Sequence, residues 1–224
     1  VTTVMDMPNT IPATTGAKEI KEKLALARNR SSANIHFHIG ATNSNHSNLA
    51  QIASQGCPEE GLKAEDIAGI KVFMGSSTGN MLVNDDESLK ELFSIKEKPI
   101  LVHCEDEDTI KRNLQAAKEK YGDDIPFEEH KNIRSRMACI KSTIKALELA
   151  MKYQTRLVLC HISTMEEVEM ARAAKLNNPE IIAETSCNYL WFSDEAYSRL
   201  GSRIKCNPSV KSDSDRQALR NALR

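Results

Sequence analysis

The sequence predicts an α/β fold in which a parallel β-sheet forms part of a (β/α)8 barrel. Six short apolar runs, several of them rich in β-branched residues, alternate with segments of helical periodicity. Polar residues follow several of these runs directly, as they do where parallel strands present side chains at their carboxyl ends. No Gly-x-Gly-x-x-Gly turn follows the first run, which disfavours a dinucleotide-binding open sheet.

The first half of the chain predicts three strands. Residues 1–7 read as a strand that ends in a turn containing Pro8 and Asn9, and residues 17–30 are rich in helix-forming Lys, Glu, Ala and Leu. In the second strand, 34–41, the apolar residues alternate with His36 and His38, so both histidines lie on one face. We expect a short helix at 48–55, a third strand at 70–74 and a loop at 75–80.

The second half continues the alternation. We expect a helix at 85–96 and a strand at 99–104, then two helices within 108–153 that are separated by 122–127. The second of these helices, from about residue 133, carries apolar residues at helical spacing. A strand at 157–161, a helix at 165–175 and a strand at 181–185 follow. Right-handed crossovers between such units give a parallel sheet.

An open doubly wound sheet also fits this order of elements, but it would spread the polar strand ends along an edge. A barrel gathers them at one mouth. Because a barrel needs eight strands and we count six, we expect residues 1–224 to form one partial barrel. The regions of its first and eighth strands would precede Val1 and follow Arg224.

Composition narrows the class of partner. The 30 basic and 31 acidic residues nearly cancel, so nothing indicates nucleic acid or a membrane surface, and we expect a small-molecule substrate. The six cysteines occur singly with no Cys-x-x-Cys pair, which is typical of a reducing compartment. No apolar run approaches the roughly 20 residues that span a bilayer. We therefore expect a cytoplasmic protein and leave a homodimer open.

Three of the predicted strands carry a side chain that could bind a metal or take part in catalysis. Lys71 stands inside an apolar strand, where an amine must be paired, neutral or modified. His103 and His161 each close an apolar run, which suggests ligands facing a common centre. Taken alone, Lys71 is also compatible with a lysine whose amine reaches solvent. Each histidine, taken alone, is also compatible with a residue hydrogen-bonded within the core or a loop. Cys104 and Cys160 should point away from the histidines, and the acids from Glu105 to Asp108 read as a helix start on a solvated face.

Five segments together resemble the dihydroorotases of the amidohydrolase superfamily: Asp6-Met-Pro-Asn9-Thr, Gly69-Ile-Lys71-Val-Phe, Val102-His103-Cys-Glu-Asp, Cys160-His161-Ile-Ser and Lys205-Cys-Asn207-Pro. The resemblance implies a (β/α)8 barrel with two zinc ions that reversibly cyclises N-carbamoyl-L-aspartate to dihydroorotate in pyrimidine biosynthesis. It also implies that Lys71 is carboxylated and bridges the zinc ions, and that His103 and His161 are metal ligands. Asn9 would hold the substrate carboxylate and Asn207 would contact the ring.

Some parts of that family's site have no counterpart in the sequence. The His-x-His pair of the first strand and the aspartate of the last strand, which is the general base, do not occur at matching positions, so we expect them outside residues 1–224. His36, His38, His46 and His130 read as structural or exposed. Met137 and Asn188 depart from the family pattern where glutamate and histidine are usual, which puts fine substrate contacts in doubt.

The chemistry explains why such residues are needed. Opening or closing a cyclic amide requires a nucleophilic water and a polarised carbonyl, which a two-metal site supplies. A carboxylated lysine offers two oxygens that bridge metals, and neutral imidazoles suit zinc.

Two other functions remain open. One is an allantoinase or dihydropyrimidinase with the same metals and another substrate, and the other is a non-catalytic barrel kept for assembly. Since six strands cannot close a barrel, we expect the chain alone to bind zinc weakly and to be inactive.

Overall fold

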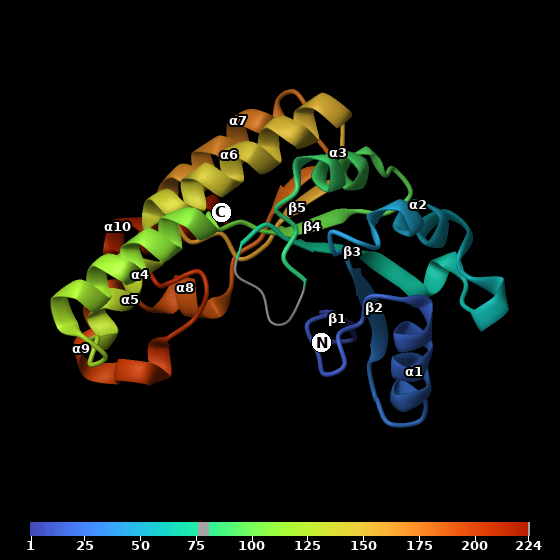
Figure 1. Cartoon of the computed structure of the whole chain (residues 1–224), viewed down its shortest axis with the longest axis horizontal. Coiled ribbons are helices and arrows are strands. Elements are labelled where there is room, and N and C mark those ends of the chain that lie inside the picture. The colour runs from blue at the N-terminus through green and yellow to red at the C-terminus, as the bar shows by residue number, and fades with distance from the viewer. Residues whose placement is uncertain (76–80, 224) are drawn as a thin grey trace.

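A computed structural model describes residues 1–75 and 81–223. Its centre is a single parallel sheet of six strands in the order in which they occur along the chain (Figure 1). The strands are β1 (Thr3–Asp6), β2 (Asn34–Gly40), β3 (Ile67–Phe73), β4 (Ile100–His103), β5 (Leu157–Leu159) and β6 (Ile181–Ala183). Each strand therefore pairs with its sequence neighbours, as in a (β/α)8 barrel and unlike a doubly wound sheet, whose order reverses. The predicted partial barrel is confirmed.

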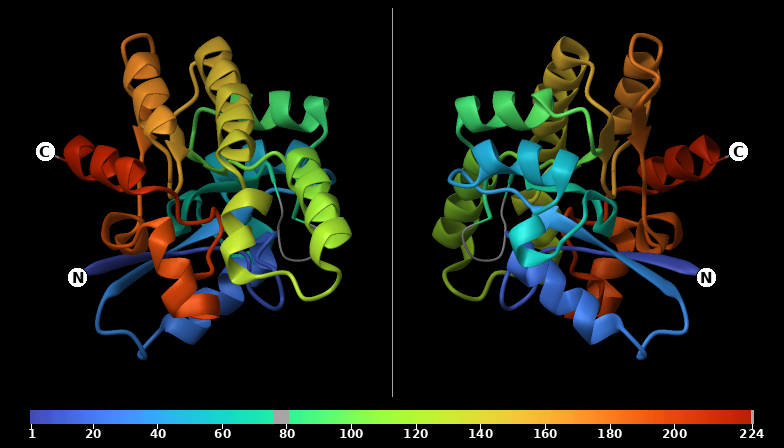
Figure 2. Two further views of the ribbon diagram at one scale, coloured as in Figure 1. Left: turned by 90° about the vertical axis from the view of Figure 1, so that its left-hand side faces the viewer. Right: turned by 90° about the vertical axis from the view of Figure 1, so that its right-hand side faces the viewer.

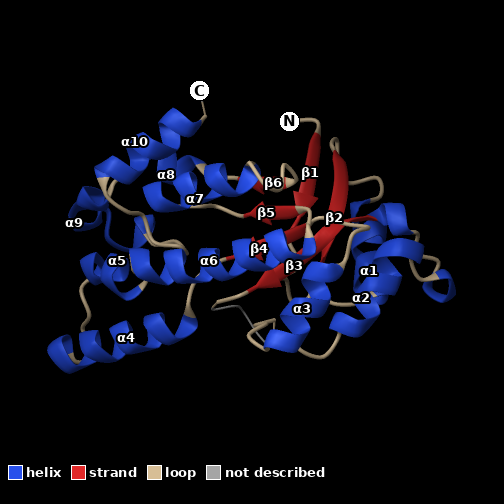
Figure 3. Ribbon diagram, turned by 90° about the horizontal axis from the view of Figure 1, so that it is seen from above, coloured by secondary structure: helices blue, strands red, loops and turns tan. Residues whose placement is uncertain are grey.

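Helices fill every connection from the first strand to the last. They are α1 (Ala17–Ala27), α2 (His46–Gln55), α3 (Asp86–Ser94), α4 (Glu107–Tyr121), α5 (His130–Ile133), α6 (Arg136–Tyr153) and α7 (Met165–Lys175). After β6 come α8 (Cys187–Trp191), α9 (Tyr197–Leu200) and α10 (Asp213–Ala222). Helices α2, α3, α6 and α7 lie side by side over one face of the sheet, while α4, α5 and α8 to α10 gather beyond the ends of β4 to β6 (Figures 1 and 3).

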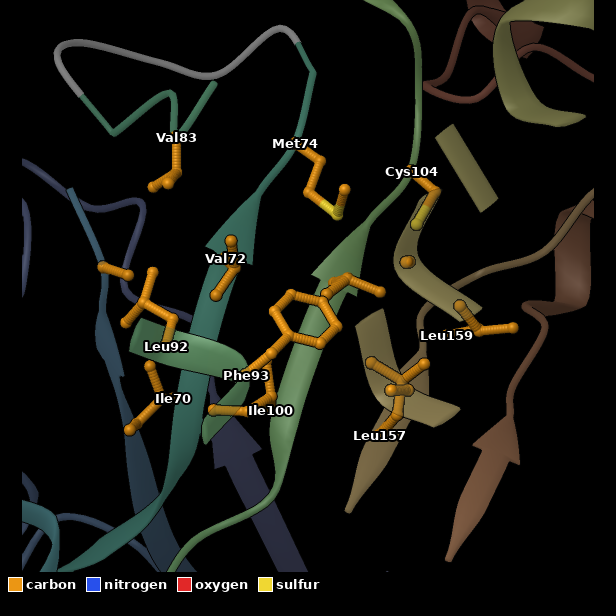
Figure 4. Packing of buried hydrophobic residues seen from close by; sticks show 14 of the residues in the cluster. Ile70, Val72, Met74, Val83, Leu92, Phe93, Ile100, Cys104, Leu157 and Leu159 are labelled. Atoms are coloured by element: carbon orange, nitrogen blue, oxygen red, sulfur yellow. The ribbon is translucent and has the colours of Figure 1, made fainter. Parts of the chain in front are cut away.

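The core lies between the sheet and these helices. Alternate strand residues point into it, among them Ile70, Val72, Ile100 and Leu157, and Phe93 of α3 packs against them (Figure 4). Because side chains alternate across a strand, the residues between these point to the other face, which is the inside of the barrel. The buried hydrophobic layer thus determines which residues reach the site.

Several helices begin where their sequence provides a cap. The Asp106 carboxylate accepts a hydrogen bond from the Thr109 backbone N–H at 3.0 Å, which fixes the start of α4. Thr164 and Glu167 form a capping box at the start of α7. These caps begin their helices a few residues after β4 and β5, so the connection that follows His103 at the end of β4 and the one that contains His161 are both short.

The sheet is curled, and its first and last strands turn toward the same side of the molecule (Figure 2). Within the described residues, β1 pairs only with β2 and β6 only with β5. Met5 on β1 is 58% exposed and Ile182 on β6 is 52% exposed, both far above the core residues of the central strands. Of the loop predicted at 75–80, residues 76–80 lie outside the described residues. Among the described helices, none is long and apolar enough to cross a bilayer.

Candidate metal centre

The side chain of Lys71 points to the inner face of the sheet. It lies on β3 between Ile70 and Val72, which both point into the helix-facing core. Its side chain is 2% exposed, and its Nζ has no hydrogen-bond partner among the described residues. The Phe73 ring, 5.2 Å away, offers only a cation–π contact. Such a contact is too weak to offset the desolvation of an ammonium, so this amine must be neutral, paired with a further group or modified.

His103 and His161 face each other beside Lys71. His103 Nδ1 lies 3.2 Å from His161 Nε2, and the two ring centroids are 4.9 Å apart with planes inclined by 66°. Burial, followed by the charges of His103 and Lys71, lowers the pKa of His161 to about 2. The three side chains that the sequence singled out therefore share one environment.

The backbone of His161 explains how it joins the cluster. The preceding residue, Cys160, already points to the inner face, because Leu157 and Leu159 lie in the helix-facing core and side chains alternate along the strand. Burial raises the pKa of its thiol to about 11, while the charge of Lys71 acts against this and that of Glu184 adds to it. Strict alternation would then turn His161 toward the helices. Instead His161 has φ 43°, in the left-handed region, which redirects its side chain. The prediction that Cys160 points away from the site was wrong, whereas Cys104 does lie in the helix-facing core.

Glu105 belongs to the site, although the sequence reading placed it on a solvated helix start. It is fully buried, and its Oε2 lies 2.9 Å from His103 Nε2 and in contact with Arg134 Nη1. Burial would raise the pKa of Glu105, but the hydrogen bond from His103 and the charges of His103 and Arg134 lower it overall. Gly75 makes room for this residue, because a Cβ there would lie 2.1 Å from the Glu105 carbonyl oxygen. Asp106, the next residue, caps α4, so the predicted helix start does lie among these acids.

His38 is a second buried neighbour that was read as merely structural or exposed. It lies on the inner face of β2, opposite Gly69 of β3, and is 3% exposed. Burial, and then the charge of Lys71, lowers its pKa to about 4. Its Nδ1 has no hydrogen-bond partner among the described residues. The alternation in 34–41 placed His36 and His38 on one face, but only the pairing with β3 brings His38 to Lys71.

Asn9 and Asn207, the predicted substrate contacts, are both exposed. Asn9 follows Pro8, which packs near Gly40, the register partner of Lys71. Asn207 follows Cys206, whose carbonyl oxygen lies 2.7 Å from His130 Nε2. No hydrogen bond among the described residues joins either asparagine to the Lys71, His103 and His161 cluster. Their substrate roles stay predictions.

His130, buried at the start of α5, gives a test of the protein's pH dependence. Burial lowers the pKa of His130 below its ordinary value, with the hydrogen bond to Cys206 acting against this. The unfolded chain, with a histidine pKa of about 6.5, then binds more protons than the folded one, so this contribution to stability is lost as pH falls through about 6.5. We expect the urea midpoint to fall more between pH 7.5 and 5.5 in the unsubstituted protein than in a His130→Gln variant. Equal falls would contradict this.

The donor set fits zinc, although it does not complete a zinc site. Within residues 1–75 and 81–223, no three His, Cys, Asp or Glu side chains group closely enough to hold a metal ion. Zinc binds imidazole nitrogens at about 2.0–2.1 Å in tetrahedral geometry, which separates two such nitrogens by about 3.3–3.4 Å. The 3.2 Å between His103 Nδ1 and His161 Nε2 is close to this value. Beside these two nitrogens, the buried Nζ of Lys71 has no hydrogen-bond partner among the described residues.

The chain is similar in sequence to dihydroorotases and allantoinases. No protein-family model matches the chain. It is 32% identical over 232 residues to a dihydroorotase of Methanosarcina acetivorans, covering 100% of this chain and 46% of that protein. It is 28% identical to an allantoinase of Desulfitobacterium hafniense, covering 92% of this chain and 44% of that protein.

Solved structures show the same fold. The L-hydantoinase (dihydropyrimidinase) from Arthrobacter aurescens superposes with a TM-score of 0.86 at 23% identity, covering 98% of this chain and 47% of that one. The chain thus spans less than half the length of the relatives and of the solved structure compared here.

Proposed function

Because this chain belongs to the cyclic amidohydrolases, we propose that the protein containing it is a zinc-dependent dihydroorotase. It would convert N-carbamoyl-L-aspartate to dihydroorotate and back, in the cytoplasm. One observation carries the metal-dependent part of this proposal: a buried amine without a partner lies beside two imidazoles whose facing nitrogens are 3.2 Å apart. On this proposal the remaining metal ligands and the general base come from segments outside residues 1–224.

The substrate choice rests on sequence. Three dihydroorotases are 30 to 32% identical to this chain and a fourth is 24% identical, whereas the allantoinases compared are 26 to 28% identical. The Asp6-Met-Pro-Asn9-Thr turn is also more typical of dihydroorotases than of the other cyclic amidohydrolases. Asn9, exposed beside the carboxyl end of β2, can donate its amide N–H groups to a substrate carboxylate.

The residues of this chain have separate tasks in the proposed mechanism. Zinc ions bound here would polarise the amide carbonyl and lower the pKa of water at the site. Lys71, as a carbamate, would hold the ions with its oxygens instead of burying an unpaired charge. His103 and His161 would donate neutral nitrogens, and burial keeps His161 unprotonated at neutral pH. Asn9 and Asn207 orient the substrate so that the reacting groups meet in a productive geometry.

The test is turnover by the full-length, zinc-loaded protein with dihydroorotate, allantoin and dihydrouracil at equal concentrations. We expect kcat/KM for dihydroorotate to exceed the other two values at least about a hundredfold, since correct pairing of a substrate's polar groups discriminates strongly. A preference for allantoin or dihydrouracil would assign the protein to another cyclic amidohydrolase activity. No turnover of any of the three would contradict an enzymatic function in this class.

A further inference from the structure

Glu105 occupies a position that a solvated helix start does not explain. Its side chain is 0% exposed, yet it carries a charge that must be balanced inside the protein. Among the described residues, Oε2 is contacted by His103 Nε2 at 2.9 Å and by Arg134 Nη1, while Oε1 has no hydrogen-bond partner. The carboxylate therefore joins an arginine to a histidine that is a candidate metal ligand.

This contact determines which nitrogen of His103 carries a proton. An ionised carboxylate can only accept hydrogen bonds, so the facing Nε2 must be the protonated nitrogen. When the imidazole is neutral, as metal binding requires, its lone pair is on Nδ1. That nitrogen is the one that faces His161, 3.2 Å away. The lone pair thus points to the place where the two imidazoles converge.

Arg134 keeps the carboxylate in place and is itself held from two directions. Its backbone N–H donates to the His130 carbonyl at 2.9 Å, and its own carbonyl accepts a hydrogen bond from Ser209 Oγ at 2.8 Å. His130 in turn contacts the Cys206 carbonyl at 2.7 Å. The segment 206–209, which contains Asn207, is therefore tied to the same turn that orients Glu105.

We propose that Glu105, held by Arg134, is a positioning residue that fixes His103 as its Nε2–H tautomer and directs Nδ1 to the metal. Carboxylates that accept a hydrogen bond from a ligating histidine orient the ring and increase its basicity. The inference rests on the proposed function only in assuming that a metal binds here. It adds Glu105 and Arg134 to the residues on which metal affinity depends.

The tautomer can be measured without metal. In the full-length, metal-free protein labelled with ¹⁵N-histidine, the ring signals of His103 are assigned by their loss in a His103→Gln variant. We expect the shifts of a protonated Nε2 and an unprotonated Nδ1. In Glu105→Leu, which has no acceptor, we expect a mixture of tautomers. A wild-type His103 protonated on Nδ1 overturns the proposal.

Zinc affinity provides the second readout, by competition with a chromophoric chelator. Loss of an outer partner typically weakens metal binding about 10–100-fold, which we expect for Glu105→Leu. Glu105→Gln keeps the shape and an acceptor but no charge, so it should fold and bind zinc with intermediate affinity. Asp215→Asn is the matched control, because Asp215 is also buried and paired with an arginine, Arg136, but does not contact either histidine. Its zinc affinity should stay within about twofold of wild type.

The outcomes separate this inference from the proposed function. If Glu105→Leu binds zinc as tightly as the unsubstituted protein and leaves the His103 tautomer unchanged, Glu105 has only a structural role and the inference fails. If the tautomer and the zinc affinities behave as expected while dihydroorotate is not turned over, the positioning role stands and the proposed substrate is wrong.

Discussion

Replacing Lys71 by methionine in the full-length protein is expected to abolish turnover and zinc bridging while making the metal-free protein more stable. The side chain is buried and its Nζ lacks a hydrogen-bond partner among the described residues. A buried polar group without a partner costs about 1–3 kcal/mol in protein mutational data, and methionine fills a similar volume without that cost. A rise of about 1–2 kcal/mol in the free energy of unfolding should follow, measured by urea titration in the presence of a chelator.

Lys211 provides the matched control for this substitution. It is 6% exposed, but its Nζ donates to the Ser209 carbonyl and to Ser209 Oγ, each at 2.9 Å, and to Ser163 Oγ at 3.3 Å. Lys211→Met should lower the free energy of unfolding by about 1–3 kcal/mol, because it leaves these oxygens without a donor. Opposite signs for the two variants would identify Lys71 as the amine kept for function. Equal destabilisation would mean that Lys71 has a structural partner.

Removing either imidazole should have nearly the full effect of removing both. We expect His103→Ala and His161→Ala each to lower kcat/KM by more than about a hundredfold, beyond the loss typical for an outer partner of a metal ligand. His103 Nδ1 and His161 Nε2 lie 3.2 Å apart and face the same position, so the two side chains should act as a unit. The double variant should therefore be little worse than either single one.

The measurement for these variants is a double-mutant cycle on both kcat/KM and zinc affinity. His46→Ala is the control, because His46 pairs with Glu91 on the surface and is remote from the cluster in sequence and contacts. It should leave both quantities within about twofold. Additive losses from His103 and His161 would mean that the two side chains serve different sites.

Much of the fold could be predicted because local pattern and global topology agree. The strand at 34–41 and the helix at 165–175 were placed to within about a residue of β2 and α7. Alternation of apolar residues defines the first. The short helices after β6 were missed: α8 and α9 have five and four residues, too few for a periodic pattern.

The cluster of Lys71, His103 and His161 could be predicted because each residue ends or interrupts an apolar run. Glu105 and His38 could not, for two different reasons. The sequence Cys-Glu-Asp-Glu-Asp reads as a solvated helix start, and only the turn at 130–134, about 29 residues later, brings Arg134 to pair with Glu105. His38 needs the register of β2 against β3 to place it by Lys71.

Cys160 and His161 show a limit of alternation itself. A period of two assigns them to opposite faces, and Cys160 does take the inner one. His161 also reaches the site, because its left-handed backbone breaks the period. Only Gly adopts this conformation freely, so a histidine gives no sequence signal for it.

The central claim is that Lys71, His103 and His161 hold a shared pair of zinc ions. It is tested most directly by anomalous diffraction at the zinc edge from crystals of the full-length protein grown with zinc and bicarbonate. We expect one zinc peak at about 2.0–2.1 Å from both His103 Nδ1 and His161 Nε2, with carboxylate density on Lys71 Nζ between this peak and a second one. Zinc peaks remote from these nitrogens, or an unmodified Lys71 beside an occupied site, would contradict the account.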